Sequence, residues 1–495
     1  SDFVTFGHVF AIGAVKAGET LMLKSEDGAW LTTPVDEKVR HPDQSLLHAI
    51  ITSYAQLNNP QQKFKLYRVS KSVAVTVLAS EPPQFNLEFG ISLSLSDGDY
   101  SATLNASNAK LKTKKVWLDG ELVSEHIYTS PLVNDSRQEH AGLHARFYVR
   151  SYLSNLGQKK KTKVTALVEN TYAYQPSPQD YRYDLRVSYN GKSIFSKTSV
   201  DHHHKTRWKK DFVLKGNDSI HVVFKKAYLM NTGALPLYDP EITVDDSLIR
   251  SHSSNYLKHS GLMQKGAIYN PMGTGGGRVD IGPLPGWTVS YILSQDKRAQ
   301  SAMLGNASQA GSWPIHYRMK STDQVVRIDQ KPYVGLFGSK GDMTNRETGE
   351  LEAFPNCVHC NSPLKADGAH QPSLAYVPYM LTGDYFYLEE LQFWANYNLL
   401  HTNPWYRRKD EGIFRRRQVR DEAWGLRTLG QVAFITPDLN EHKQYFEAIL
   451  ANNLDYLYNV YVEREEEDRD GSKVVNRLGY LPSPLIDTFG VRSGE

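Results

Sequence analysis

The sequence predicts a multidomain protein of mixed β and α structure, with β-rich domains first and a helical region last. The chain has 495 residues, which exceeds the size of one ordinary domain. Up to about residue 340, short segments rich in β-branched and aromatic residues are separated by turn residues. After about residue 368, apolar residues recur with the helical period of about 3.6.

The composition is typical of globular proteins, with 40% hydrophobic and 22% charged residues. The 57 basic and 54 acidic residues give a net charge of +3, so we expect no nucleic-acid partner. No run of about 18 apolar residues occurs, so we expect no membrane insertion. No signal peptide is seen at the start. This favours cytosolic synthesis, with later secretion or incorporation into a virus particle as alternatives.

Residues 1–128 are predicted to form the first β-rich domain. Segments 64–69 and 73–78 carry β-branched and aromatic residues at roughly alternate positions. Asp97-Gly98 marks a turn of the kind that separates short strands. Regularly spaced short strands are typical of a closed barrel or a sandwich.

Residues 129–340 are predicted to form a second domain, an antiparallel β-sandwich. Segments 163–169, 183–189 and 219–224 alternate between apolar and polar residues. An Asn-Gly pair follows the second of these segments and indicates a tight hairpin turn. Long strands joined by hairpins favour a large sandwich.

Residues 341–368 are predicted to be a linker or a long loop, and residues 369–495 a helical domain. The apolar pattern predicts three helices, at residues 385–401, 419–435 and 439–462. Sequential helices with short connections pack as antiparallel pairs. Three helices cannot close a ring. We therefore expect further chain after Glu495, or packing on the sandwich or on a second subunit in a homo-oligomer or virion assembly.

Three groups of segments carry a resemblance to a known family: residues 4–7, 13–19, 34–36 and 41–49; residues 143–147, 168–170, 206–210 and 278–283; and residues 370–376 with 381–389. In this order they resemble the N-terminal RIFT barrel, the central β-sandwich and the start of the C-terminal α/α toroid of the exo-rhamnogalacturonan lyase and YetA-like family. That family commonly shows a WPDGSVRHA-like turn, where this chain has Gln44 for the Gly and Leu47 for the Arg. The family's toroid is much longer than the helical part of this chain.

The resemblance implies a polysaccharide lyase that cleaves an acidic, pectin-type glycan by β-elimination, with a glycoside hydrolase as second choice. The alternative is a non-catalytic virion or surface protein that uses the same fold for structure or glycan binding. The partner in either case is a polysaccharide. The sequence identifies no metal ligands. A divalent cation such as calcium is the one candidate cofactor for the implied reaction.

β-Elimination on a uronate needs a cation at the carboxylate, a base for the C5 proton and an acid for the leaving oxygen. His370 and Tyr376 stand at the entry of the helical domain and are candidates for base and acid. Alternatively, His370 caps a helix and Tyr376 belongs to the core. Arg420 is the candidate that neutralises the carboxylate.

Trp424 and Arg427 lie at helical spacing from Arg420 and are candidate substrate-binding residues. A Trp ring can stack on a sugar ring, and an Arg can pair with an acidic group. Alternatively, the arginines pair with neighbouring acids and the Trp is buried in the core.

His204, the last of a run of three histidines, is a candidate for a cleft wall that binds substrate, together with Arg207 and Trp208, which follow the run. Alternatively, the histidines form a surface turn. Cys357 and Cys360 have the spacing of half a zinc site, but zinc needs four ligands, so the sequence favours a reduced pair or a local disulfide over a zinc site.

Overall fold

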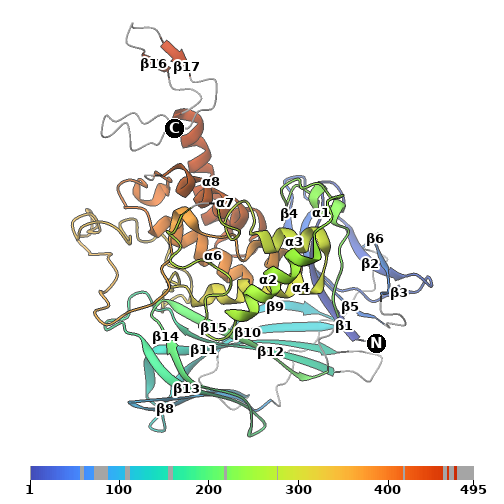
Figure 1. Cartoon of the computed structure of the whole chain (residues 1–495), viewed down its shortest axis with the longest axis horizontal. Coiled ribbons are helices and arrows are strands. Elements are labelled where there is room, and N and C mark those ends of the chain that lie inside the picture. The colour runs from blue at the N-terminus through green and yellow to red at the C-terminus, as the bar shows by residue number, and fades with distance from the viewer. Residues whose placement is uncertain are drawn as a thin grey trace.

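The computed structural model describes residues 2–55, 61–71, 87–105, 112–153, 160–216, 220–275, 277–415 and 418–460, and two short strands after them. The described chain is a mixed structure of antiparallel strands and helices (Figure 1). The predicted segment 73–78 lies outside the described residues.

The N-terminal part contains six strands: β1 (Asp2–Val9), β2 (Glu19–Ser25), β3 (Trp30–Leu31), β4 (Val35–Arg40), β5 (Leu46–Ala55) and β6 (Phe64–Ser70). They form two three-stranded antiparallel sheets, in the orders β1-β5-β4 and β3-β2-β6. In β2, Leu21, Leu23 and Ser25 are buried, and Met22 and Lys24 between them are partly exposed. One face of this sheet therefore contributes to the core.

A nine-stranded sheet follows. Its strands are β7 (Phe89–Leu95), β8 (Gly98–Leu104), β9 (Lys112–Gly120), β10 (Val123–Val133), β11 (Glu139–Leu153), β12 (Lys160–Asn170), β13 (Tyr181–Tyr189), β14 (Lys192–His202) and β15 (Thr206–Lys215). The order is β14-β13-β7-β8-β10-β11-β12-β15, with β9 paired to β10. The sheet folds into two facing layers, which enclose an apolar core that contains Phe89, Phe147 and Leu185 (Figure 1).

Two sequence predictions for this sheet are confirmed, and one boundary differs. Segments 163–169 and 183–189 are strands, and Asn190 and Gly191 have the positive φ angles of 48° and 75° that a tight hairpin turn requires. The sheet begins before residue 128, because β7 to β9 pair within it. A hydrophobic pattern shows where a strand lies but not which strand it pairs with, so the sequence cannot place this boundary.

The sequence pattern predicts β structure as far as residue 340, but the described residues after β15 form helices and loops. These helices are α1 (Lys226–Asn231), α2 (Asp246–Lys258), α3 (Gly286–Ser294), α4 (Lys297–Gln309) and η1 (Ala310–Ser312). The helical period is present in α4, which buries Ala299, Ala302 and Met303. Residues 220–224 of the predicted strand 219–224 are a loop, and the Phe224 N–H donates to the Gln295 side chain instead of a neighbouring strand.

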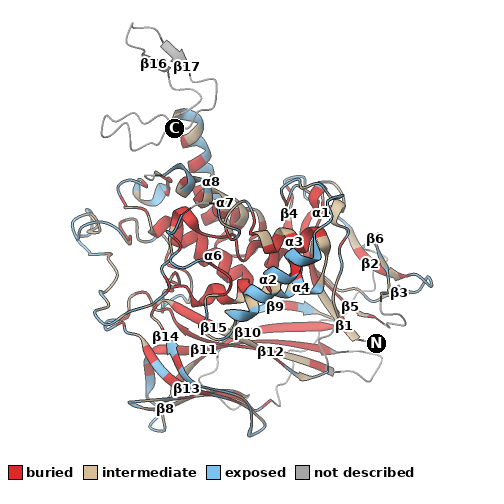
Figure 2. Cartoon of the chain, viewed as in Figure 1, coloured by how far each residue is buried: buried red, intermediate tan, exposed pale blue. Residues whose placement is uncertain are grey.

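The C-terminal helices are η2 (Gly368–His370), α5 (Tyr376–Thr382), α6 (Tyr385–Leu400), η3 (Lys409–Glu411), α7 (Val419–Ile435) and α8 (Lys443–Tyr458), and the two short strands are β16 (Glu465–Glu467) and β17 (Lys473–Val475). The three predicted helices are confirmed as α6, α7 and α8, with α8 shorter than predicted. All residues of α6 are buried, whereas α2 exposes one side (Figure 2). Helix α6 is therefore a central element and not a surface helix. Within the described residues, no helix has the length and apolar character needed to cross a membrane.

Helix α5 packs directly on the N-terminal sheet at Gly7 of β1. A Cβ atom on Gly7 would lie 2.3 Å from the Met380 carbonyl oxygen, which is backbone and cannot rotate away. The same oxygen accepts a hydrogen bond from His48 Nε2 at 3.1 Å. This contact joins the first β domain to the helical region.

Replacing Gly7 by Ala is expected to lower the free energy of unfolding by about 1–3 kcal/mol, because the added methyl forces β1 and α5 apart. Gly430→Ala is a matched control, since Gly430 lies within α7 and an added Cβ meets nothing within 4 Å. That change is expected to stabilise the protein by about 0.5–1 kcal/mol. Thermal or urea unfolding measures both effects, and equal melting temperatures for the two variants would contradict the assignment.

Acid is expected to destabilise the fold as the pH falls from about 6.5 towards 4. Burial lowers the pKa of His48 to about 3 and that of His202 to about 4. The unfolded chain binds these protons near pH 6.5 and the folded chain does not, so stability is present above pH 6.5 and is lost below it. Each histidine contributes about 1.4 kcal/mol per pH unit in this range. The melting temperature of His48→Gln should depend less steeply on pH than that of the unchanged protein.

Candidate functional site

Strand β11 presents ionisable residues to the helices and apolar residues to the sandwich core. Phe147 and Val149 belong to the core between the two layers of the sheet. Arg146 and Tyr148 point the other way and contact Glu389 of α6. Because successive side chains of a strand point to opposite faces, the alternating sequence of β11 places charges beneath α6.

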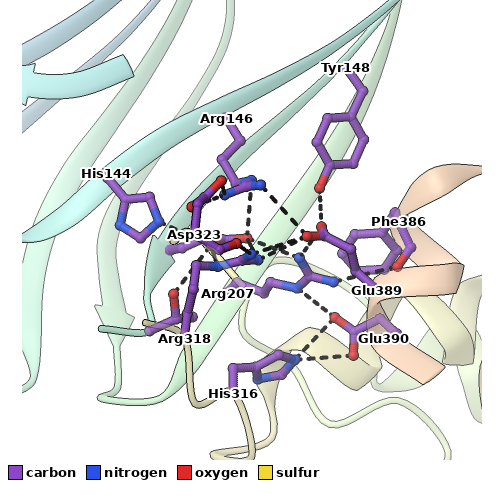
Figure 3. A network of polar contacts seen from close by, with 12 residues as sticks. His144, Arg146, Tyr148, Arg207, His316, Arg318, Asp323, Phe386, Glu389 and Glu390 are labelled. Atoms are coloured by element: carbon purple, nitrogen blue, oxygen red, sulfur yellow. Dashed lines mark hydrogen bonds and ion pairs between the residues drawn. The ribbon is translucent and has the colours of Figure 1, made fainter. Parts of the chain in front are cut away.

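Three arginines and three glutamates meet between the sheet and α6 (Figure 3). Arg207 Nη1 lies 2.9 Å from Glu169 Oε1 and 2.9 Å from Glu389 Oε2. Arg207 Nε lies 2.6 Å from Glu390 Oε1. Arg318 Nε lies 2.9 Å from Glu169 Oε2, and its Nη2 lies 3.1 Å from Glu389 Oε1. The carboxylates of α6 thus share their cations with a carboxylate of β12.

Five further contacts surround this centre: Arg146 with Asp323 at 2.7 Å, Arg146 with Glu389 at 3.6 Å, His144 with Glu169 at 3.0 Å, His316 with Glu390 at 3.1 Å, and the Tyr148 hydroxyl with Glu389. We call this set of residues the α6 charge network. Its members are His144, Arg146, Tyr148, Glu169, Arg207, His316, Arg318, Asp323, Glu389 and Glu390. It joins β11, β12, β15, α6 and the loop after η1 into one unit.

The α6 charge network is largely closed to solvent, and its three arginines all pair with carboxylates. The side chains of Glu169, Arg207 and Glu390 are 0% exposed. Burial alone would raise the pKa of Glu169, but the charges of Arg318 and Arg146 hold this pKa well below its usual range. Every arginine drawn in Figure 3 has carboxylate partners. The network therefore leaves neither a free cation nor an open surface for a substrate.

A small pocket lies beside the network, at the N-terminus of α6. Its lining residues are Glu125, Tyr148, Arg150, Lys163, Thr165, Lys209, Asp384, Tyr385 and Phe386. Arg150 pairs with Glu125 at 2.6 Å and with Asp384 at 2.8 Å. The pocket has room for about one water molecule, so it does not accommodate a sugar ring.

The predicted cleft wall at His204, Arg207 and Trp208 does not form a single surface. Arg207 belongs to the α6 charge network, whereas Trp208 faces the sandwich core and donates from Nε1 to the Tyr183 hydroxyl at 2.7 Å. His204 is buried, and its backbone N–H donates to Asp180 at 2.8 Å. Burial lowers the pKa of His204 to about 3, so this histidine is neutral at physiological pH.

Tyr376 and Arg420 also lie apart from each other. The Tyr376 side chain is buried, and its hydroxyl donates to the Ala234 carbonyl at 2.7 Å. Arg420 is exposed, and its Nε donates to the Gln418 side chain at 2.8 Å. Neither residue contacts the other predicted site residues through a hydrogen bond in the described structure.

The structure does bring His370, Trp424 and Arg427 into one neighbourhood, at the packing of η2 against α7. Arg427 Nη2 donates to the carbonyl of Gln371, the residue after His370, at 3.0 Å. The guanidinium carbon of Arg427 lies 5.0 Å from the centre of the Trp424 ring. His370 Nδ1 contacts the carboxylate of Asp367. We call Asp367, His370, Trp424 and Arg427 the His370 group.

Several polar atoms of the His370 group are buried without a partner. They are His370 Nε2, Trp424 Nε1 and Arg427 Nε. Most buried polar atoms in proteins have hydrogen-bond partners, so three such atoms on neighbouring residues are unusual. Because a carboxylate oxygen accepts hydrogen bonds, Nδ1 donates to Asp367, and Nε2 is the ring nitrogen that is left for another partner.

Arg427 differs from the arginines of the α6 charge network in its partners. Its guanidinium donates to the carbonyls of Gly282 and Gln371, at 2.6 and 3.0 Å, and to the Thr428 hydroxyl. No carboxylate pairs with it among the described residues. Burial lowers the pKa of Arg427 to about 9, so it remains a cation at neutral pH. An acidic ligand would supply the missing negative charge.

Sequence reasoning missed Asp367 and Arg278 in this neighbourhood. Asp367 lies three residues before His370, a spacing that allows contact across a single helical turn. Arg278 Nη2 donates to the His370 carbonyl at 3.0 Å, and its Nε pairs with Asp280 at 3.1 Å. The Asp367 spacing could be found in the sequence, but the contact of Arg278 depends on the tertiary fold.

No group of three or more His, Cys, Asp or Glu residues within the described ranges is placed to hold a metal ion. Cys357 and Cys360 form a disulfide in the loop between residues 341 and 368. Of the possibilities left open by the sequence for this pair, the structure shows the local disulfide.

Comparison with known proteins gives no family assignment. No protein-family model matches the chain, and no curated protein matches it significantly. Functional inference for this protein therefore depends on the chemistry of its own residues.

The α6 charge network predicts a large loss of stability when one partner is removed. Arg207→Met leaves Glu169, Glu389 and Glu390 with less positive charge in a buried site, and we expect the free energy of unfolding to fall by about 3–5 kcal/mol. Arg298→Met is a matched control, because Arg298 pairs with Asp296 at the surface and such pairs contribute about 0–1 kcal/mol. Similar melting temperatures for both variants would refute a stabilising role for the network.

Proposed function

We propose that the protein is a polysaccharide lyase that cleaves an acidic glycan by β-elimination at the His370 group. The observation that carries this proposal is the Asp367–His370 contact beside an arginine that has no carboxylate partner. A lyase of this kind needs a base and a cation close together.

Each residue of the group has a role in this reaction. Asp367 orients the imidazole, and His370 Nε2, which is buried in the described structure, is the proposed base for the C5 proton of a uronate. Arg427 pairs with the C6 carboxylate and stabilises the negative charge that develops as the proton leaves. Trp424 stacks on a sugar ring beside it. When the C4–O bond breaks, the protonated His370 returns its proton to the leaving oxygen, so the step is balanced without a second acid.

The finer architecture is part of the same proposal. The two N-terminal sheets correspond to a RIFT-type barrel, the nine-stranded sheet to a central sandwich, and helices α5 to α8 to the opening of an α/α toroid. The order of β and helical parts along the chain supports this proposal. A glycan lyase would then bind its substrate where η2 packs against α7.

A glycoside hydrolase is less well supported by this site. Hydrolysis requires two carboxyl groups that face each other across the glycosidic bond. In the His370 group, the one carboxylate is Asp367, and it contacts His370. The non-catalytic alternative, a virion or surface protein that binds glycan, remains as an outcome of the experiment below.

The test follows the ultraviolet absorbance of unsaturated uronate products from polygalacturonate, rhamnogalacturonan and alginate, with and without calcium. We expect His370→Gln to lower kcat by about 10²–10⁴-fold, as loss of a general base does. Arg427→Gln should lower kcat/KM by about 10²–10³-fold. Thermal unfolding of both variants checks that they remain folded.

Arg420→Gln tests which arginine pairs with the substrate carboxylate. The sequence analysis predicts Arg420, whereas the structure favours Arg427. Arg420 is exposed and does not contact the His370 group through any hydrogen bond of the described structure, so this variant should keep its activity. Equal losses in the Arg420 and Arg427 variants would place the cation site elsewhere. Glycan binding without any product over the whole panel would favour the non-catalytic protein.

A further inference from the structure

The sheet β3-β2-β6 carries two exposed aromatic residues on its outer face. Trp30 is 48% exposed and Tyr67 is 39% exposed. Their ring centres lie 5.3 Å apart, with the ring planes at 67°. The inner face of this sheet is already filled by Leu21 and Leu23, which are buried in the main core. Trp30 and Tyr67 therefore do not serve to complete the core.

Two lysines lie beside these rings. Lys24 of β2 is directly opposite Trp30 of β3 and directly opposite Lys65 of β6. Directly opposed residues of antiparallel strands project from the same face, so Trp30, Lys24 and Lys65 form a row across the outer face. Tyr67 lies two residues beyond Lys65 along β6 and projects from the same face.

The charges in this row have no ion-pair partner among the residues that the structure describes. Lys24 Nζ lies 4.9 Å from the centre of the Trp30 ring, and neither Lys24 nor Lys65 makes an ion pair with any described residue. Like charges directly opposite each other on a sheet are destabilising. Such a pair becomes favourable when an anion lies between the two ammonium groups. The row therefore has a local charge that complements an acidic ligand.

We propose that Trp30, Tyr67, Lys24 and Lys65 form a binding platform for an acidic polysaccharide, separate from the His370 group. Sugar rings stack on Trp30 and Tyr67, and the carboxylates of uronate residues pair with Lys24 and Lys65. That the polymer is a polyuronate follows from the proposed lyase function, on which this part of the proposal rests. Figure 1 shows the sheet at the right-hand edge of the molecule, away from α7. The platform holds the polymer, and the His370 group cleaves it.

An acidic polysaccharide fits this surface better than a nucleic acid does. Aromatic rings with lysines also bind single-stranded nucleic acids, but such sites lie in extended basic grooves. The chain as a whole is nearly balanced, with 57 basic and 54 acidic residues. The platform offers two cations beside two rings, which suits widely spaced carboxylates on stacked sugar rings.

The experiment measures binding of the full chain to polygalacturonate, alginate and hyaluronate by isothermal titration calorimetry, in the His370→Gln background to prevent turnover. Trp30→Ala and Tyr67→Ala should each weaken binding by roughly three- to tenfold. The double change Lys24→Gln and Lys65→Gln should weaken binding and reduce its dependence on salt. This double variant retains both rings, so it tests the platform even if an aromatic variant is unstable.

Tyr406→Ala is the matched control, because Tyr406 is 43% exposed and lies outside the platform. It should leave binding unchanged. No measurable binding to any of the three polymers, or equal binding by the platform variants, would overturn the proposal. Tighter binding of a single-stranded DNA oligonucleotide than of the polymers would also overturn it.

The platform and the lyase proposal can fail separately. If the platform variants lose polymer binding but the unchanged protein releases no unsaturated product, the platform stands and the lyase proposal fails. If lyase activity on short oligosaccharides is present and the platform variants bind polymer normally, the lyase proposal stands and the platform fails.

Discussion

Ion pairs buried between α6 and the nine-stranded sheet fix the position of the helical region on the β structure. Removing a charge from water costs several kcal/mol, and a buried pair offsets this cost only when its geometry is good and its remaining polar atoms are bonded. Arg207 meets these conditions, because it contacts Glu169 of the sheet and Glu389 and Glu390 of the helix at once. A shift of α6 along the sheet would break the contacts of Arg207 with Glu389 and Glu390, so the network determines position as well as stability.

The position of α6 in turn determines the position of the His370 group. Asn398, near the C-terminal end of α6, and Gln371 exchange hydrogen bonds through their side-chain amides, at 2.5 and 3.1 Å. The carbonyl of Gln371 accepts from Arg427, and Gln371 directly follows His370. A continuous series of contacts therefore leads from the charge network through α6 to the proposed base and cation. Rigid support of this kind is what a catalytic pair requires, because small displacements reduce its rate.

Elements with a local pattern could be predicted from the sequence, and contacts between distant segments could not. The period of residues 419–435 gave the bounds of α7, because a helix is stabilised by neighbours along the chain. The separation of Arg207 from Trp208 was also accessible, since adjacent strand residues face opposite sides. The partners of Arg207 were not, because they lie on β12 and on α6, far away in the sequence. Of the helices between residues 226 and 312, α1 and α3 have only 6 and 9 residues and show few turns of the helical period, whereas α2 and α4 have 13 residues each and were missed although the period is present in α4.

The arginines of this protein fall into two classes that differ in their counter-charges. Arginines of the α6 charge network are matched by carboxylates from the chain itself, so a ligand would gain little by approaching them. Arg427 has only backbone carbonyls and a hydroxyl as partners, and its positive charge is not neutralised by any described residue. Keeping such a cation partly buried costs free energy that the fold does not recover by itself. An acidic ligand at Arg427 would offset this cost, and the proposed lyase reaction would use Nε2 of the neighbouring His370 as its base.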